Sequence, residues 1–128
     1  MIEAAGSDIS TSTLLLVDDE PSILSSLKRL FRPHGYRILT ADGGAQGLDV
    51  LEQEQVDLVI SDMRMPHMDG ARFLEQVRIR WPDSIRILLT GYADIESTVA
   101  AINRGEVYRY INKPWDDNEI ILIVREAL

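Results

Sequence analysis

The residues of this sequence that could do chemistry are polar side chains that each follow a short apolar run. They are the acidic pair Asp18-Asp19, the single carboxylate Asp62, the hydroxyl of Thr90, and Lys113 with Pro114 after it. The apolar runs before them, residues 14–17, 58–60, 85–89 and 110–111, are typical of buried strands. Since parallel strands have their carboxyl ends at one edge of a sheet, three carboxylates, a hydroxyl and an ammonium are expected to meet there.

Carboxylates gathered at one point repel each other unless a divalent cation neutralises them, so this collection predicts a magnesium site. Mg²⁺ takes about six oxygen ligands and usually keeps several waters, so two carboxylates and one backbone carbonyl suffice. We expect Asp19 and Asp62 to bind the ion directly and Asp18 to act through water. The alternative is that Asp18 and Asp19 cap the following helix, with Glu20 adding favourable charge at its N-terminus. The matching positions of Asp62 and Lys113 favour the metal site.

The same collection suits a phosphoryl transfer onto an aspartate. Asp62 is the expected nucleophile, which would form an acyl phosphate. Thr90 is expected to donate its hydroxyl to one phosphoryl oxygen, and Lys113 to place positive charge beside another. Each also has a structural alternative, as a turn aspartate, a strand-end threonine and a surface lysine, and Asp69 fits a turn role better than Asp62 does. The sequence leaves open whether the peptide bond before Pro114 is cis.

Strand-like and helix-like segments alternate along the chain. Strands are expected at residues 14–17, 37–41, 56–61, 85–89 and 108–111. Helices are expected from Pro21, after Gly43-Gly44, across Phe73, Leu74 and Val77, from Asp94 to Gly105, and from near Asp117 onward. Five strand–helix repeats imply right-handed crossovers, and therefore an α/β fold with a doubly wound parallel sheet covered by helices on both faces.

Composition bounds the class of protein. A chain of 128 residues with 45% hydrophobic and 27% charged residues is typical of one globular domain. The net charge of −8 argues against a nucleic-acid surface, and the absence of cysteine excludes disulfides, thiolate metal sites and cysteine nucleophiles. No apolar run reaches the roughly 18 residues that span a bilayer. Residues 1–12 are expected to form a disordered tail rather than a signal peptide, and the protein is expected in the cytoplasm.

Four stretches resemble the receiver domain of two-component response regulators: residues 15–21, 61–70, 88–92 and 110–115. The resemblance implies a flavodoxin-like (βα)5 fold with sheet order 2-1-3-4-5 and a receiver domain over residues 13–128. It implies a switch rather than an enzyme, phosphorylated on Asp62 by a histidine kinase or phosphotransfer protein with Mg²⁺. It also implies that the backbone carbonyl of Arg64 is a metal ligand and that Thr90 and Tyr110 are a switch pair. Residues 91–97 and 108–115 look most like receivers joined to HD-GYP phosphodiesterase or NtrC-like output regions.

In a receiver, phosphorylation would act on one face of the domain. Phosphate on Asp62 would draw Thr90 inward, and Tyr110 would then turn from an exposed to a buried position. The face made by the fourth helix, fifth strand and fifth helix would change shape, limited by the contacts that phosphate makes in the two states. Arg64 and Tyr92 would overhang the phosphoryl group, so we expect them to restrict the hydrolytic water and lengthen the phosphorylated lifetime.

The expected last helix carries more apolar residues than one sheet-facing stripe needs. Ile120, Ile123, Val124 and Ala127 are placed to cover the sheet, whereas Ile121, Leu122 and Leu128 lie elsewhere on the helix. This surplus suggests a homodimer or a C-terminal output domain that this chain lacks. The alternative is packing against the fourth helix.

Three other classes share part of this pattern. A phosphatase of the haloacid dehalogenase type would have an acid two residues after its nucleophile, where this chain has Arg64. A flavin-binding module would have a Ser/Thr/Gly-rich phosphate loop after the first strand, where Asp18, Asp19 and Glu20 would repel a phosphate. A pseudo-receiver would lack a site residue, and none is missing.

Overall fold

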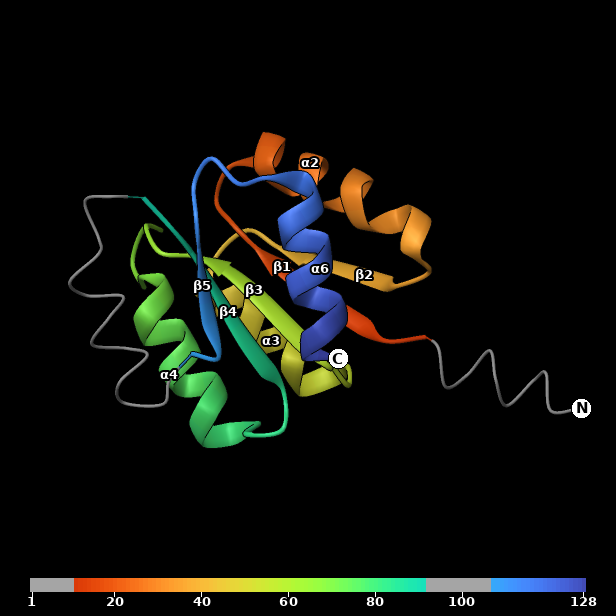
Figure 1. Ribbon diagram of the computed structural model, residues 1–128. Coiled ribbons are helices and arrows are strands. Elements are labelled where there is room, and N and C mark those ends of the chain that lie inside the picture. Colours follow the sequence, from red (N-terminus) through yellow and green to blue (C-terminus); the bar gives the residue numbers. More distant parts are fainter. Residues whose placement is uncertain (1–10, 92–106) are drawn as a thin grey trace, which may run out of the picture.

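Five parallel strands in one sheet form the centre of the protein (Figure 1). The structure, a computed structural model, describes residues 11–91 and 107–128. The strands are β1 (Thr13–Val17), β2 (Arg37–Ala41), β3 (Leu58–Asp62), β4 (Ile85–Thr90) and β5 (Arg109–Asn112). Their order in the sheet is β2-β1-β3-β4-β5, which confirms the predicted flavodoxin-like topology.

Helices cover both faces of the sheet (Figure 1). One face packs against α2 (Pro21–Phe31) and α6 (Asp117–Ala127), and the short 3-10 helix η1 (Arg32–His34) continues α2. The other face packs against α3 (Gly44–Gln53) and α4 (Gly70–Arg80). The central strands β1 and β3 are buried along their whole length, as expected for a sheet covered on both sides. The core therefore holds the strand ends that carry the polar residues in fixed positions.

The helix starts follow local sequence signals. Pro21 occupies the first turn of α2, where its missing N–H costs no hydrogen bond. The Asp69 side chain caps α4 by accepting a hydrogen bond from the Arg72 N–H at 2.8 Å, which confirms the structural role expected for this residue. Asp116 caps α6 in the same way, accepting from the Glu119 N–H at 3.0 Å. Each cap satisfies one backbone N–H in the first turn of its helix and so marks where α4 and α6 begin.

Element boundaries differ from the predictions by one or two residues. β3 is Leu58–Asp62 rather than 56–61, and β5 is Arg109–Asn112 rather than 108–111. Asp57, directly before β3, accepts a hydrogen bond on its side chain from the Thr13 N–H at 2.7 Å, and its own N–H donates to the Thr13 carbonyl at 2.9 Å. The helix expected from Asp94 to Gly105 and most of the expected N-terminal tail lie outside the described residues.

Across residues 11–91 and 107–128, no helix combines the length and the apolar character that crossing a bilayer requires.

Candidate functional site

The carboxyl ends of β1, β3, β4 and β5 bring the predicted site residues to one edge of the sheet. Val17, the last residue of β1, lies opposite Ser61 in β3, so Asp18 and Asp62 follow in adjacent positions. Thr90, the last residue of β4, lies opposite Asn112 in β5, directly before Lys113. Register alone therefore puts these side chains on neighbouring strand ends.

Three carboxylates cluster at this edge. Asp18, Asp19 and Asp62 each offer one oxygen, and the three oxygens lie within 4.8 Å of one another. Asp18 is 1% exposed and Asp62 is 6% exposed, whereas Asp19 faces solvent. The arrangement of two buried acids and one exposed acid leaves a solvent-facing side through which water ligands can reach an ion.

The alternative that Asp18 and Asp19 cap the next helix fits this geometry less well. The N-cap of α2 is Glu20, and no side chain makes a capping hydrogen bond there. Asp18 Oδ1 does accept a hydrogen bond from the Glu20 N–H at 2.9 Å, which orients the carboxylate. Its other oxygen, Oδ2, is buried and finds no hydrogen-bond donor among the described residues. A buried carboxylate oxygen without a hydrogen-bond donor is costly, and a divalent cation bound directly beside it would offset that cost.

The electrostatics of Asp18 reflect this burial. Burial, the largest cause, raises the pKa of Asp18 to about 6 against the hydrogen bond from Glu20, and the negative charge of Asp62 adds to the increase. The site thus holds more negative charge than its own residues neutralise.

Lys113 is the cation that the fold supplies. Its Nζ lies 2.8 Å from Asp62 Oδ1 and 3.7 Å from Asp18 Oδ2. Its backbone N–H donates to the Thr90 carbonyl at 2.9 Å, and the Lys113-Pro114 peptide is cis, which answers the question left open by the sequence. Burial alone would lower the pKa of Lys113, but the hydrogen bond and charge of Asp62, with the charge of Asp18, outweigh it and raise that pKa. Lys113 is therefore held in its charged form beside Asp62.

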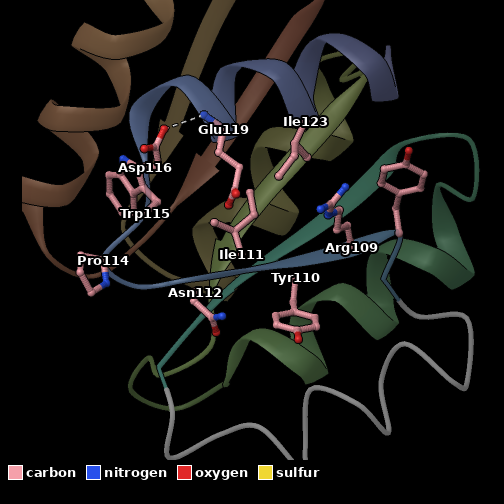
Figure 2. Close-up of a pocket in the computed structure, with 10 residues that line it drawn as sticks. Arg109, Tyr110, Ile111, Asn112, Pro114, Trp115, Asp116, Glu119 and Ile123 are labelled. Atoms are coloured by element: carbon pink, nitrogen blue, oxygen red, sulfur yellow. Dashed lines mark hydrogen bonds between the residues drawn. The ribbon is translucent and has the colours of Figure 1, made fainter.

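Thr90 and Tyr110 lie on the same face of the sheet. Thr90 is fully buried, and its hydroxyl donates to the Gly91 carbonyl at 3.2 Å. Tyr110 lies opposite Leu88 in β4, two residues before Thr90, and two residues along a strand return to the same face. Tyr110 is half-buried against the core shared with α3 and α4, and in Figure 2 it projects from β5 away from α6.

The loop after β3 carries Arg64, whose side chain is exposed two residues beyond Asp62. Its expected effect on phosphate lifetime stays a prediction, and Tyr92 lies outside the described residues. The loop also contains His67, a non-glycine residue with φ of 71°. Such left-handed backbone is uncommon outside glycine, though histidine is enriched there.

One residue of the site was not singled out from the sequence. The backbone of Gly70 is so close to β3 that an added Cβ would lie 2.1 Å from the Asp62 carbonyl oxygen. Its N–H donates to the Met63 carbonyl at 2.7 Å. Gly70 thus lets the start of α4 pack directly on the backbone of Asp62. The Asp-Gly pair at 69–70 was visible as a turn signal, but the close approach is a tertiary contact.

A profile of the response regulator receiver domain matches residues 14–125 of the chain. The chain belongs to this family. GlrR, a transcriptional regulatory protein of Escherichia coli strain K12, is 41% identical over 115 residues, which cover 90% of this chain and 26% of that protein. The DNA-binding transcriptional regulator NtrC of the same strain is 34% identical over 113 residues, which cover 88% of this chain and 24% of NtrC.

Solved receivers agree with this assignment. The signal receiver domain of an HD domain-containing protein from Pseudomonas fluorescens Pf-5 has a TM-score of 0.87 and 43% identity, over 91% of this receiver chain and 94% of that chain. Relatives of both predicted kinds, NtrC-like and HD-linked, are therefore found. The chain spans about a quarter of the length of the curated relatives it matches.

Membership of the family makes the chain a phosphorylation-dependent signalling domain rather than a conventional enzyme. Receiver domains work with histidine kinases or phosphotransfer proteins, and the longer relatives join their receiver to a further, C-terminal region.

Proposed function

We propose that Asp62 accepts a phosphoryl group from a histidine kinase or phosphotransfer protein. The observation that carries this proposal is the contact of 2.8 Å between Lys113 Nζ and Asp62 Oδ1 at an edge where three carboxylates converge. A carboxylate that is nearly buried, paired with a lysine and reachable beside an exposed acid has the surroundings of a nucleophile. A turn aspartate would need none of them.

Mg²⁺ fits this donor set. Its ligands would be the carboxylates of Asp19 and Asp62 and the backbone carbonyl of Arg64, with Asp18 acting through water. Three carboxylate oxygens within 4.8 Å and a buried oxygen of Asp18 that has no donor supply the negative charge that a hard dication requires. When bound, the ion offsets the charge of the carboxylates and of the incoming phosphoryl oxygens.

The transfer itself needs one nucleophile and fixed positive charge. An oxygen of Asp62 forms a bond to phosphorus as the bond from phosphorus to the donor's histidine nitrogen breaks. The nitrogen keeps the bonding electron pair and the donor leaves with a neutral or protonated imidazole. Lys113 remains beside the phosphoryl oxygens, and the Thr90 hydroxyl turns from the Gly91 carbonyl to donate to another of them.

The response follows from the movement of Thr90. Its inward shift would free space on the face of the sheet that it shares with Tyr110, a half-buried side chain packed against the core on that face. Tyr110 turning inward would reshape the surface made by the helix expected at 94–105, β5 and α6. That surface would control a C-terminal output domain or a partner, or form a homodimer. Leu122 and Tyr108, exposed at 49% and 55%, add apolar area to it.

The rest of the assignment follows from this chemistry. Residues 13–128 would be the receiver and residues 1–12 a tail. The domain would catalyse only its own phosphorylation and dephosphorylation, without contact to nucleic acid or membrane. A cytoplasmic location belongs to the same proposal, because ATP, the phosphate source of a kinase, is cytoplasmic.

Intact-mass spectrometry after incubation with acetyl phosphate tests the proposal. We expect the wild type to gain one phosphoryl group with Mg²⁺ and none with a chelator, and Asp62→Asn to gain none in either condition. The phosphate should survive acid and be lost in alkali, as acyl phosphates are. Continuous turnover of a phosphomonoester without a phosphorylated protein would instead favour a phosphatase.

A further inference from the structure

A hydroxyl group lies buried in the apolar face of β3, directly before Asp62. Ser61 is fully buried, and it lies opposite Val17 in β1 and Leu88 in β4. Both neighbours belong to the apolar core that α3 and α4 cover. An aliphatic side chain would pack there at no polar cost, whereas a buried hydroxyl costs free energy unless it forms a hydrogen bond. The partner of this hydroxyl therefore indicates what it contributes.

The partner is the backbone carbonyl of the proposed phosphoacceptor. Ser61 Oγ donates to the Asp62 carbonyl oxygen at 2.9 Å. In the same peptide, the Met63 N–H donates to the Leu89 carbonyl in β4, also at 2.9 Å. The C=O and the N–H of a trans peptide point in opposite directions, so the Asp62 carbonyl faces away from β4 and toward β1. The ladder between β1 and β3 ends at the pair Val17 and Ser61, so the hydroxyl supplies a donor just beyond the end of that ladder.

The same carbonyl also packs against the start of α4. The backbone of Gly70 lies so near that a Cβ there would be 2.1 Å from the Asp62 carbonyl oxygen. The Gly70 N–H donates to the next carbonyl along the chain, that of Met63, at 2.7 Å. The peptide between Asp62 and Met63 is therefore held by a hydrogen bond at each end and by close packing, and the carbonyl that follows it is held as well.

The direction of this peptide determines the geometry of the proposed magnesium site. The Asp62 side chain and the peptide share a Cα atom, so a rotation of the peptide about that atom changes how the carboxylate is aimed relative to the Arg64 carbonyl. Mg²⁺ tolerates little error in its ligands, because it requires nearly octahedral geometry with oxygens at about 2.1 Å. A small rotation would therefore weaken the metal site and misalign Asp62 for its attack on phosphorus.

We propose that Ser61 is a positioning residue for phosphotransfer, whose buried hydroxyl holds the peptide between Asp62 and Met63 so that the Asp62 carboxylate and the Arg64 carbonyl converge on one ion. This rests on the proposed function, because it concerns the same acceptor and the same metal. Ser61 acts through the backbone of its neighbour and takes no part in bond formation.

Ser84 offers a matched control. It is also buried, and its Oγ donates to a backbone carbonyl, that of Val56, at 2.6 Å. Ser84 directly precedes β4 and Val56 comes shortly before β3, so this bond lies at the amino ends of the strands. The proposed site lies at their carboxyl ends. Ser84→Ala therefore removes the same kind of buried hydrogen bond without touching the site.

Calorimetric titration with Mg²⁺ and the rate of labelling by acetyl phosphate test the proposal. Ser61→Ala and Ser84→Ala should both lower the urea midpoint of unfolding, because each leaves a buried carbonyl without a donor. Only Ser61→Ala should also weaken Mg²⁺ binding, by about tenfold in Kd, and slow labelling at saturating Mg²⁺ by about tenfold. Ser61→Thr keeps the hydroxyl and should recover most of both losses. The two alanine variants decide the question even if the extra methyl group of threonine lowers stability.

The outcomes separate this proposal from the proposed function. Wild-type Mg²⁺ affinity and labelling rate in Ser61→Ala would overturn the role of Ser61 and leave the proposed function intact. Equal losses of affinity and rate in Ser61→Ala and Ser84→Ala would also overturn it, because they would reflect general destabilisation rather than positioning. Failure of the wild type to bind Mg²⁺ or to be labelled on Asp62 would instead refute the proposed function.

Discussion

Burying the ionised carboxylate of Asp18 costs free energy that the contacts of the fold do not fully offset. Its carboxylate is 1% exposed, one oxygen has no hydrogen-bond donor among the described residues, and burial raises its pKa to about 6 from 3.8. A folded-state pKa above the unfolded value means that this group contributes stability below about pH 4, and that the contribution is lost as pH rises through about 6. At neutral pH the ionised side chain therefore opposes folding, because the charge of Lys113 at 3.7 Å does not offset its burial, until a divalent cation also binds.

Replacing the Asp18 carboxylate by a neutral amide should show how much its burial destabilises the folded protein. We expect Asp18→Asn to raise the free energy of unfolding by about 2 kcal/mol near pH 7.5 in chelator, and to leave it nearly unchanged near pH 4. Urea denaturation at several pH values measures this. Mg²⁺ should stabilise the wild type and have much less effect on the variant. A variant that is less stable than the wild type near pH 7.5 without metal would contradict this account of Asp18.

His67 stores local strain in the loop after β3. Its φ of 71° is one that glycine adopts freely and other residues do not, so His67→Gly should stabilise the protein by about 0.5–1 kcal/mol. His34→Gly is the matched control, because His34 is also exposed but has no positive φ, and it should be neutral or destabilising. Thermal denaturation compares the two, and a gain in the control rather than in His67→Gly would count against the strain.

Single residues were predictable where a local turn signal or the shared edge of a parallel sheet determined their place. Asp69 was expected in a turn and caps α4, and Asp18, Asp62 and Lys113 were expected to meet and do. The donorless oxygen of Asp18 was not predictable, because its burial depends on the strands and helices packed around it. The left-handed backbone of His67 was not predictable either, since nothing in a histidine side chain requires it.

At the scale of elements, the start of α4 is fixed to the end of β3 by the absence of a side chain at Gly70. A Cβ there would lie 2.1 Å from the Asp62 carbonyl oxygen and 2.9 Å from Leu88 Cδ1. Backbone cannot yield as a flexible side chain does. The spacing between β3 and α4, and with it the direction of Asp62, therefore depends on this glycine.

Gly70→Ala should accordingly destabilise the protein by about 3 kcal/mol or more and slow its phosphorylation. Gly43→Ala is the control, because a Cβ at Gly43 meets nothing within 4 Å and its φ of 178° is extended backbone. Denaturant unfolding and labelling by acetyl phosphate measure both effects. Equal stability of the two variants would show that the close packing of α4 on β3 does not require a glycine at position 70.

Element types followed from periodicity, the parallel sheet followed from crossover rules, and the sheet order followed from the resemblance to receiver domains. Element ends followed from none of these. β3 begins at Leu58, and the Asp57 side chain before it bonds to the Thr13 N–H, a contact between segments 44 residues apart. Asp62 and Thr90 proved to be the last residues of their strands rather than the first residues of loops. Pairing with a neighbouring strand decides where a strand ends, and this pairing cannot be predicted from one segment of sequence alone.

At the scale of the whole molecule, the proposed switch depends on Thr90 linking the phosphate to Tyr110 and β5. Thr90→Ala removes the hydroxyl, so we expect it to accept phosphate from acetyl phosphate while β5 and α6 keep the hydrogen-exchange pattern of the unphosphorylated protein. Thr90→Ser keeps a hydroxyl and should respond as the wild type does. Hydrogen exchange monitored by mass spectrometry, with and without phosphorylation, measures this. If phosphorylated Thr90→Ala showed the same hydrogen-exchange change in β5 and α6 as the wild type, Thr90 would not link the phosphate to Tyr110 and β5.

The central claim is that Asp62, among the three carboxylates at this edge, is the one that carries phosphate. Borohydride reduction of the phosphorylated protein converts an aspartyl phosphate to homoserine, and peptide sequencing by mass spectrometry then locates it. The account predicts homoserine at position 62, formed only when Mg²⁺ was present during phosphorylation. Homoserine at position 18 or 19, or phosphate on a serine, threonine or histidine, would contradict it.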